Sequence, residues 1–155
     1  MIRRCIMKKK NINEKTVIGW REYIDFPEWG IKGIRAKVDT GARSSSLHVD
    51  DVKLLGDDQI RFYVTVSNKE SAKRKKVIAR IHRRGRVVSS TGHGTHRWYV
   101  KAVIRIGKVD HRITLNLTDR SGMNFPMLLG RTALKDDFLV DVDRSFLISK
   151  KKKGK

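Results

Sequence analysis

The 155-residue sequence has a single cysteine, few acidic residues and no long apolar run. Cys5 cannot form an internal disulfide, which is typical of a protein in the reducing cytoplasm. No apolar stretch approaches the ~18 residues that a membrane-spanning helix needs, and the basic N-terminus has no apolar signal segment. The sequence therefore predicts a cytoplasmic protein without membrane contact.

Acidic residues number only 16, against 36 lysines and arginines, so the net charge is +20. The excess is concentrated in residues 1–15, 69–86 and 150–155, which carry +5, +8 and +5 and leave a nearly neutral body. We expect a basic N-terminal tail (1–16), one domain (17–149), a basic C-terminal tail (150–155) and a basic internal loop. Such tails keep a protein soluble, and they can also contact nucleic acid or the ribosome weakly.

Most apolar stretches are short, rich in Val, Ile, Thr and aromatic residues, and separated by Gly or acidic turns, which predicts a mostly β domain. Residues 107–110 predict a hairpin turn, and the polar, basic segment 67–76 predicts an exposed loop because it has no apolar period. Residues 132–137 predict one short helix with Thr132 as its N-cap. The expected strands are residues 31–38, 59–66, 98–106, 111–117, 138–142 and 146–148.

One motif can carry catalytic chemistry: Asp39, Thr40, Gly41 and Ala42 follow directly on the predicted strand 31–38. A strand end holds the Asp39 carboxylate rigidly, and the Thr40 hydroxyl can form a hydrogen bond to a partner. Gly41 allows the backbone of a substrate to approach closely. These residue types in this order therefore indicate a rigidly held carboxylate that a substrate can approach closely.

A second motif lies downstream, where an apolar pair precedes a glycine and an arginine: Leu128, Leu129, Gly130 and Arg131. Together the two motifs resemble the retropepsin-like aspartic peptidases, in which a strand ending in Asp-Thr-Gly-Ala lies beside such a segment, followed by a short helix. The resemblance covers residues 17–149. In the stretches 18–22, 36–48 and 117–131 the chain is most similar to a bacterial branch that has been labelled ATP-dependent zinc proteases and is linked with ATP-grasp glutamate ligases.

The resemblance implies a closed retropepsin-like β-barrel with one short C-terminal helix. An aspartic peptidase needs two carboxylates that share one proton, one acting as base on a water and the other polarising the scissile carbonyl. Because only one Asp-Thr-Gly is present, the second Asp39 has to come from another copy of the chain, in a two-fold homodimer. The other candidates in the chain, Asp119, Asp141 and Asp143, are expected in turns and ion pairs.

Two further features bear on the substrate. Gly92 and Gly94 lie between β-prone arms in residues 84–97, where a retropepsin has its substrate-covering flap; the alternative is an ordinary surface hairpin. Arg43 stands where retroviral enzymes have an acidic residue, so it favours acidic peptides, and the alternative is an ion pair with Asp50, Asp51 or Asp119. The linkage to glutamate ligases implies a Glu-rich peptide or tail as substrate.

The histidines do not predict a metal site. His93 and His96 lie in a Gly-broken segment that cannot supply the helix of a His-Glu-x-x-His zinc site, so we expect neither a metal nor another cofactor. The alternative function is non-catalytic: binding of RNA or the ribosome through the basic tails and the arginines of residues 80–86, or service as a scaffold on a degenerate peptidase fold.

Overall fold

The computed structural model describes residues 9–67, 72–88 and 91–150, and this part of the chain is mostly β with one short α-helix. No helix in these three ranges is long and apolar enough to cross a bilayer. The elements in chain order are η1 (Ile12–Glu14), β1 (Thr16–Gly19), β2 (Arg21–Phe26), η2 (Pro27–Trp29), β3 (Ile31–Val38), β4 (Ser45–His48), β5 (Asp50–Leu55), β6 (Gln59–Ser67), β7 (Ala72–Val88), β8 (Gly94–Ile106), β9 (Val109–Thr118), β10 (Met127–Leu129), α1 (Arg131–Leu134) and β11 (Phe138–Asp141).

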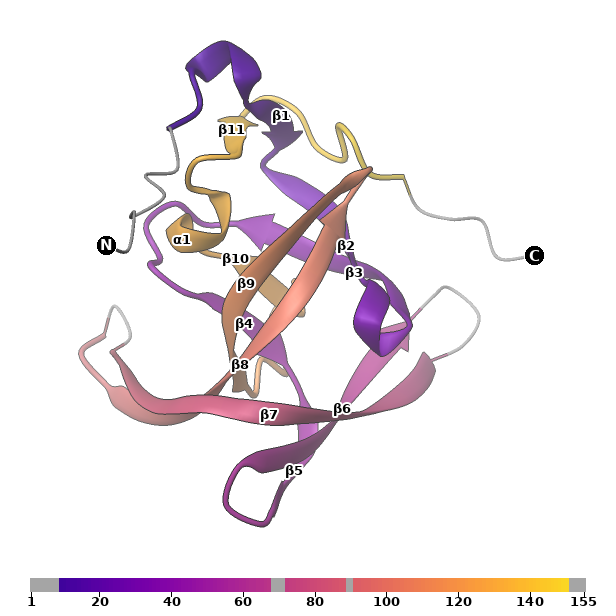
Figure 1. The fold of residues 1–155 in the computed structure, drawn as a ribbon, viewed down its shortest axis with the longest axis vertical. Coiled ribbons are helices and arrows are strands. Elements are labelled where there is room, and N and C mark those ends of the chain that lie inside the picture. The colour runs from indigo at the N-terminus through magenta and orange to yellow at the C-terminus, as the bar shows by residue number, and fades with distance from the viewer. Residues whose placement is uncertain (1–8, 68–71, 89–90, 151–155) are drawn as a thin grey trace, which may run out of the picture.

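The main sheet has nine strands in the order β2-β3-β10-β4-β9-β8-β7-β6-β5. Strand β8 also pairs with β2, at Asp25 and Arg105, so the strands from β2 to β8 in this order form a closed ring of hydrogen-bonded neighbours. The sheet is mixed, because β10 runs parallel to β3 and β9 runs parallel to β4. Strands β7, β6 and β5 continue the sheet at the end of the molecule opposite α1 and the β1–β11 pair (Figure 1).

Alternation of apolar residues along the strands builds the core, which is lined by strands of the ring and also by β6. On β6 the side chains of Ile60, Phe62 and Val64 are buried, and on β8 those of Ile104 and Ile106 are buried, as a period of two along a strand requires. These side chains belong to one continuous hydrophobic cluster. The expected hairpin is confirmed, because Ile106 pairs with Val109 across a two-residue turn, with Gly107 at φ 61°.

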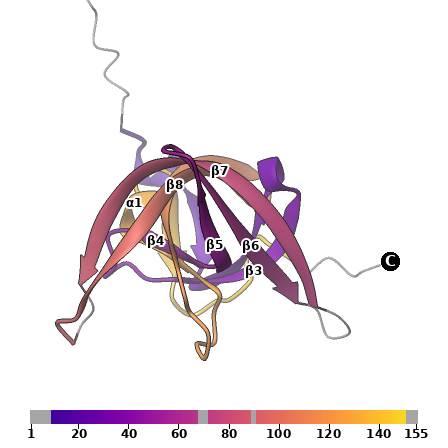
Figure 2. The ribbon, with the colours of Figure 1, turned by 90° about the horizontal axis from the view of Figure 1, so that it is seen from below.

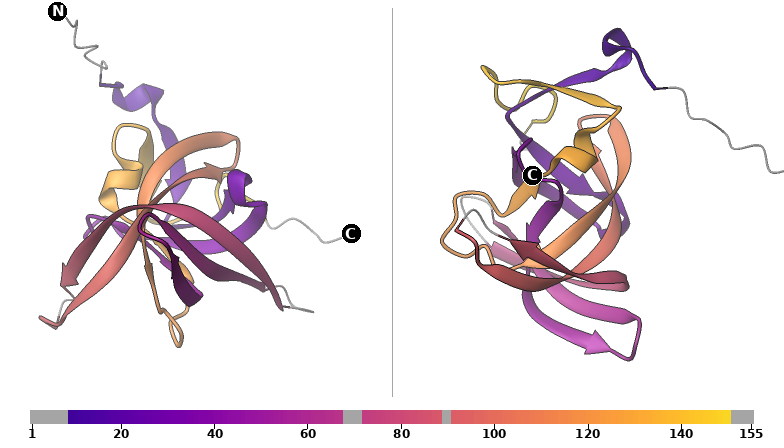
Figure 3. Two further views of the ribbon diagram at one scale, coloured as in Figure 1. Left: turned by 60° about the horizontal axis from the view of Figure 1, so that its bottom comes forward. Right: turned by 90° about the vertical axis from the view of Figure 1, so that its left-hand side faces the viewer.

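The predicted basic loop is wrong over its described part. Residues 68–71 lie outside the described residues, but Ala72 begins the 17-residue strand β7, which pairs first with β6 and then with β8. Figures 2 and 3 show β7 and β8 curving together across the molecule. The start of β7 has no apolar period because the side chains of residues 72–76 are exposed on both faces. It is held by its backbone ladder and by Arg74, whose guanidinium lies 4.4 Å from the ring centre of Tyr63.

The helix begins one residue earlier and ends sooner than predicted, covering Arg131–Leu134 instead of 132–137. Gly130 precedes it, so Thr132 is not the N-cap. The amide of Arg131 donates to the carbonyl of Ala42 (2.7 Å) and that of Thr132 to the carbonyl of Arg43 (3.1 Å). The neighbouring loop therefore satisfies the first helical N–H groups, a role that the sequence assigned to a side-chain cap.

Residues 146–148 do not form the predicted strand. The amides of Leu147, Ile148 and Ser149 instead donate to the carboxylate of Glu22 on β2, at 2.7 to 3.1 Å. In a β-strand, successive N–H groups point alternately to the two sides of the strand. Three consecutive N–H groups that all donate to one carboxylate cannot have this alternation. Of the predicted N-terminal tail, residues 9–16 are described and include η1. The predicted tail segments 1–8 and 151–155 lie outside the described residues.

Candidate active site

The Asp39 carboxylate lies in a tight turn at the end of β3. The Asp39 amide donates to the carbonyl of Leu129 (2.9 Å), which ties the start of the turn to β10. Its Oδ1 accepts hydrogen bonds from the amides of Gly41 (3.0 Å) and Ala42 (3.2 Å). Oδ2 has no hydrogen-bond partner among the residues that the structure describes. The turn thus fixes one carboxylate oxygen and leaves the other for chemistry.

Strand β10 lies between β3 and β4 and brings the second motif against this turn. Leu129 pairs with Val38, and the Gly130 amide donates to Ser45 Oγ (3.0 Å). A Cβ at Gly130 would lie 2.4 Å from the backbone of Ser44, so only glycine fits there. Beyond it, the Arg131 guanidinium donates to the carbonyls of Thr40 (3.1 Å) and Gly41 (3.4 Å) and supports the Asp39 turn.

Asp39 lines a cleft of about 1220 Å³. Gly41, Ala42 and Leu128 also line it, while Thr40 is exposed beside it and contributes only its carbonyl to the contacts described. Among the described residues that line the cleft are five arginines and one carboxylate, that of Asp39. The arginines are Arg43, Arg83, Arg86, Arg97 and Arg120.

The β7–β8 hairpin forms one wall of the cleft. Val87 and Val88 line it from β7, so the arms of the predicted flap reach the site of Asp39. Gly94 pairs with Val88 at the start of β8, and Gly92 adopts φ 86° in the exposed turn before it. Neither glycine is among the residues that line the cleft with Asp39.

The other carboxylates that the sequence offered have separate partners. Asp51 pairs with Arg74, and Asp50 lies 3.3 Å from His48 Nε2. Asp119 is exposed, and hydrogen bonding to the Ser121 side chain, followed by the bond from the Ser121 amide (2.8 Å), lowers the pKa of Asp119. Within the described ranges the exposed Arg43 guanidinium therefore has no ion pair, which leaves its charge directed at the cleft.

Asp141 and Asp143 lie in a turn that follows β11. Asp141 Oδ1 accepts a hydrogen bond from the Asp143 amide (2.9 Å), and Asp141 Oδ2 lies 3.5 Å from Arg144 Nε. Neither residue lines the cleft, so the expectation of turns and ion pairs holds for both.

The sequence did not identify Arg97, Arg120, Ser46 and Asn116 as site residues. The parallel pairing of β4 with β9 sets Ser46 beside Asn116, and Arg97 lies at the cleft end of β8. Ser46 and Arg120 stand in stretches that carry the family resemblance, which was the one available signal. No spacing along the chain relates Ser46, Arg97 and Asn116, because each comes from a different strand.

A metal centre does not fit the described residues. His93 and His96 are exposed on the β7–β8 hairpin. Nowhere in residues 9–67, 72–88 and 91–150 do three His, Cys, Asp or Glu side chains converge as a zinc site needs. We therefore derive no step through zinc.

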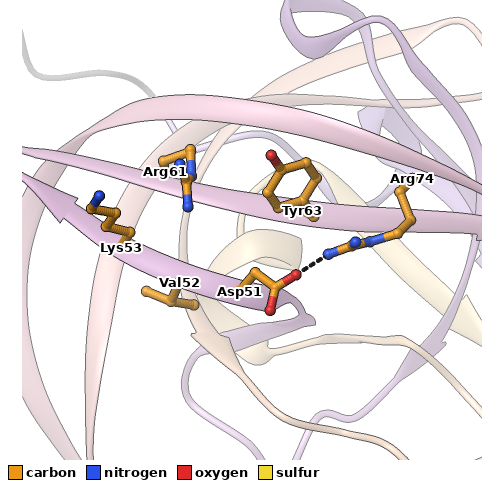
Figure 4. A pocket seen from close by; sticks show the side chains of 6 residues that line it. All are labelled: Asp51, Val52, Lys53, Arg61, Tyr63 and Arg74. Atoms are coloured by element: carbon orange, nitrogen blue, oxygen red, sulfur yellow. Dashed lines mark hydrogen bonds and ion pairs between the residues drawn. The ribbon is translucent and has the colours of Figure 1, made fainter.

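A second, shallower pocket of about 470 Å³ lies on the outer face of β5, β6 and β7 (Figure 4). Its only carboxylate, Asp51, is paired with Arg74, whose guanidinium also lies against Tyr63. Lys53 and Arg61 complete a basic surface. Among the described residues that line it, it offers cations and no unpaired carboxylate, in contrast to the Asp39 cleft.

Comparisons with known proteins agree on one family. A sequence model of RimB-like proteins, described as the retropepsin-like aspartic endopeptidase RimB, matches residues 17–151. Similar curated proteins include probable alpha-L-glutamate ligases of Shewanella pealeana (33% identical over 147 residues, 90% of this chain and 31% of that protein) and Desulfotalea psychrophila (31% over 134 residues, 82% and 28%). The chain spans about a third of the length of these relatives.

Among solved structures, a Legionella pneumophila protein of unknown function is similar, with a TM-score of 0.70 and 27% identity. The match covers 86% of this chain and 98% of that one. The likeness therefore extends over nearly the whole of the neighbouring chain and over the domain that contains the cleft.

Proposed function

The chain belongs to the family of RimB-like retropepsin-like aspartic endopeptidases, and from this we propose that it hydrolyses peptide bonds as a homodimer with one Asp39 from each protomer. The observation that carries the proposal is the Asp39 turn, which holds Oδ1 with two amides and leaves Oδ2 in an arginine-lined cleft. A lone carboxylate cannot act as acid and base at once. The two-fold pairing of Asp39 supplies the missing group.

The proposed reaction uses one shared proton. Two carboxylates in contact cannot both ionise, so one Asp39 is protonated and its partner is charged. The charged one takes a proton from a water, whose oxygen attacks the scissile carbonyl carbon, while the protonated one donates its proton to the carbonyl oxygen. Transfer of a proton to the amide nitrogen then breaks the C–N bond and releases an acid and an amine.

We propose acidic, Glu-rich peptides or tails as the substrate class. Support comes from the five cleft arginines, with Arg43 exposed and without an internal ion pair among the described residues. It also comes from the relatives that are named as probable alpha-L-glutamate ligases, since a protein named for adding glutamate provides a context in which Glu-containing chains occur. Charge-assisted hydrogen bonds from arginine to carboxylate would then orient the peptide.

The decisive test is the Asp39→Asn variant. We expect it to abolish hydrolysis of a Glu-rich peptide while the circular dichroism spectrum and the dimer mass by analytical ultracentrifugation stay unchanged, because only the shared proton is lost. Asp143→Asn, in an exposed turn outside the cleft, is the matched control and should cleave like the wild type. Equal cleavage by Asp39→Asn and wild type would end the aspartic mechanism.

A second candidate function rests on the basic outer face of β5, β6 and β7. Lys53, Arg61, Arg74 and Lys76 lie on neighbouring strands there, which suits binding of a phosphate backbone. If this is the main activity, a Lys53→Gln/Lys76→Gln variant should lose RNA affinity and show a smaller salt dependence, whereas Asp39→Asn should leave RNA binding unchanged. Unchanged RNA binding by the Lys variant would exclude this surface.

A further inference from the structure

Two arginines that the proposed mechanism does not use lie half-buried in the wall of the Asp39 cleft: Arg97 on β8 and Arg120 just after β9. Both differ from Arg43, Arg83 and Arg86, which are exposed. A half-buried guanidinium has lost part of its hydration, so its surroundings have to compensate the charge. The partners of Arg97 and Arg120 therefore indicate what the cleft is built to receive.

Among the described residues, Arg97 is held by neutral groups alone. Its Nη1 donates to Asn116 Oδ1 (3.0 Å) and lies 3.4 Å from Ser46 Oγ, and its Nε donates to Thr95 Oγ1 (3.3 Å). Asn116 is 1% exposed and is itself fixed, because its Nδ2 donates to the carbonyl of Ser45 (2.9 Å). This buried network aims the guanidinium without neutralising it.

Arg120 is positioned from its backbone and from one side-chain nitrogen. Its amide donates to His48 Nδ1 (2.8 Å), and its Nε donates to the carbonyl of Phe125 (3.0 Å). Because Nδ1 of His48 accepts that bond, the ring proton lies on Nε2, toward Asp50 at 3.3 Å. Both terminal nitrogens of Arg120 are left without a hydrogen bond to any described residue.

The positive charges of Arg97 and Arg120 repel each other. Burial lowers the pKa of Arg97, and burial together with the charge of Arg97 lowers the pKa of Arg120. The negative charge of Asp39 raises the pKa of Arg120, but this effect is smaller than the two that lower it. Among the described residues neither arginine has a carboxylate in ion-pair contact. Fixed, partly desolvated and mutually repelling guanidinium groups are relieved when an anion enters between them.

We propose that Arg97 and Arg120 form a carboxylate-binding site for the peptide substrate, next to the Asp39 dyad, and that they determine specificity for acidic peptides. This inference rests on the proposed function. The planar fork of each guanidinium suits a carboxylate, and positions fixed in advance by Asn116 and Phe125 reduce the entropy cost of binding. The carboxylate can be a side chain or the C-terminus of the peptide, two sources with one chemistry.

Binding to the Asp39→Asn variant tests the site without turnover. We would titrate fluorescent Glu-rich and Gln-rich peptides into Asp39→Asn, Asp39→Asn/Arg97→Gln and Asp39→Asn/Arg120→Gln. We expect each arginine substitution to weaken binding of the Glu-rich peptide by about tenfold or more and to leave the Gln-rich peptide within about twofold. Asp39→Asn/Arg112→Gln, which removes an exposed charge on β9 outside the cleft, should bind both peptides like the parent.

Further measurements identify which carboxylate binds and control for loss of the fold. Loss of affinity on amidation of the C-terminus assigns the site to the terminal carboxylate, and loss on Glu-to-Gln exchange alone assigns it to side chains. Arg97→Lys keeps the charge without the fork and should retain the fold with intermediate affinity. If neither the Glu-to-Gln affinity ratio nor the affinity ratio of free-acid to amidated peptide differs between the parent and both folded arginine variants, the inference is overturned. Cleavage by the wild type in that case would leave the proposed function standing.

Discussion

Glu22 is a fully buried carboxylate that has no role in the proposed reaction. Its Oε1 accepts hydrogen bonds from the amides of Gly19 (3.0 Å), Leu147 (2.7 Å) and Ile148 (3.1 Å), and its Oε2 accepts from the amide and hydroxyl of Ser149. The charge is therefore compensated by oriented donors rather than by a cation. One side chain ties the C-terminal segment 146–149 to β2.

We expect Glu22→Gln to lower the free energy of unfolding by about 1–3 kcal/mol, because an amide NH₂ would face donors that need an acceptor. Urea denaturation followed by tryptophan fluorescence measures the change. Glu28→Gln, at an exposed position of η2, is the matched control and should stay within about 0.5 kcal/mol of the wild type. A Glu22→Gln protein as stable as the control would mean that the other contacts of the segment, such as the hydrogen bond from the Phe146 amide to the Arg21 carbonyl, hold it without the carboxylate.

At the scale of elements, the β7–β8 hairpin combines two kinds of pairing. Strand β7 pairs with β6 up to Arg80, and β8 pairs with β9 from Trp98 onward. Strands β7 and β8 pair with each other from Ile81 with Val100 to Val88 with Gly94. Over 85–88 and 94–97, where neither strand pairs with a third described strand, the hairpin is a two-stranded ribbon. Such ribbons open more easily than strands inside a sheet.

We expect amides 84–88 and 91–97 to exchange hydrogen quickly in the free protein and to gain protection when a non-cleavable peptide isostere binds, because the ribbon then closes over Asp39 and excludes water. Hydrogen exchange with mass spectrometry resolves these segments. Residues 59–66 of β6, inside the sheet, provide the internal reference and should not change. Equal exchange of the ribbon with and without the isostere would make it a structural hairpin and not a flap.

The strands were predictable where one face of a strand is buried. Ile60, Phe62 and Val64 alternate because only every second side chain reaches the core. The strand Ala72–Lys76 was missed since neither of its faces is buried, and a ladder of backbone hydrogen bonds leaves no pattern in the sequence. The ring closure at Asp25 and Arg105 is likewise a long-range pairing.

In the candidate site, too, the local features were predictable from the sequence and the long-range ones were not. Asp39, Gly41 and the 128–131 segment were found because each motif is contiguous, and the short reach of a tight turn brings its members together. Arg97 and Asn116 come singly from β8 and β9 and are joined only by strand register. Because this network joins residues of separate strands, the sequence contains no regular spacing that would reveal it.

At the scale of the whole molecule, the net charge of +20 and the cleft arginines act over different distances. The overall charge attracts an acidic peptide through solvent and raises the rate of association, an effect that salt screens. The screening length shrinks from about 10 Å at 0.1 M to about 3 Å at 1 M ionic strength. Contacts made by the half-buried Arg97 and Arg120 are screened much less.

Between 0.1 M and 1 M salt we therefore expect the association rate of a Glu-rich peptide with the Asp39→Asn protein to fall by about tenfold or more, while its dissociation rate changes little. In the Asp39→Asn protein the preference for the Glu-rich over the Gln-rich peptide should persist at 1 M salt, although smaller than at 0.1 M, and it should be weaker still in Asp39→Asn/Arg97→Gln. Stopped-flow fluorescence separates the two rates, and the Gln-rich peptide, whose association should barely respond to salt, is the control. A preference that disappears at 1 M together with the rate enhancement would assign acidic selectivity to long-range attraction alone, since direct guanidinium–carboxylate contacts inside a cleft do not vanish with the screening length.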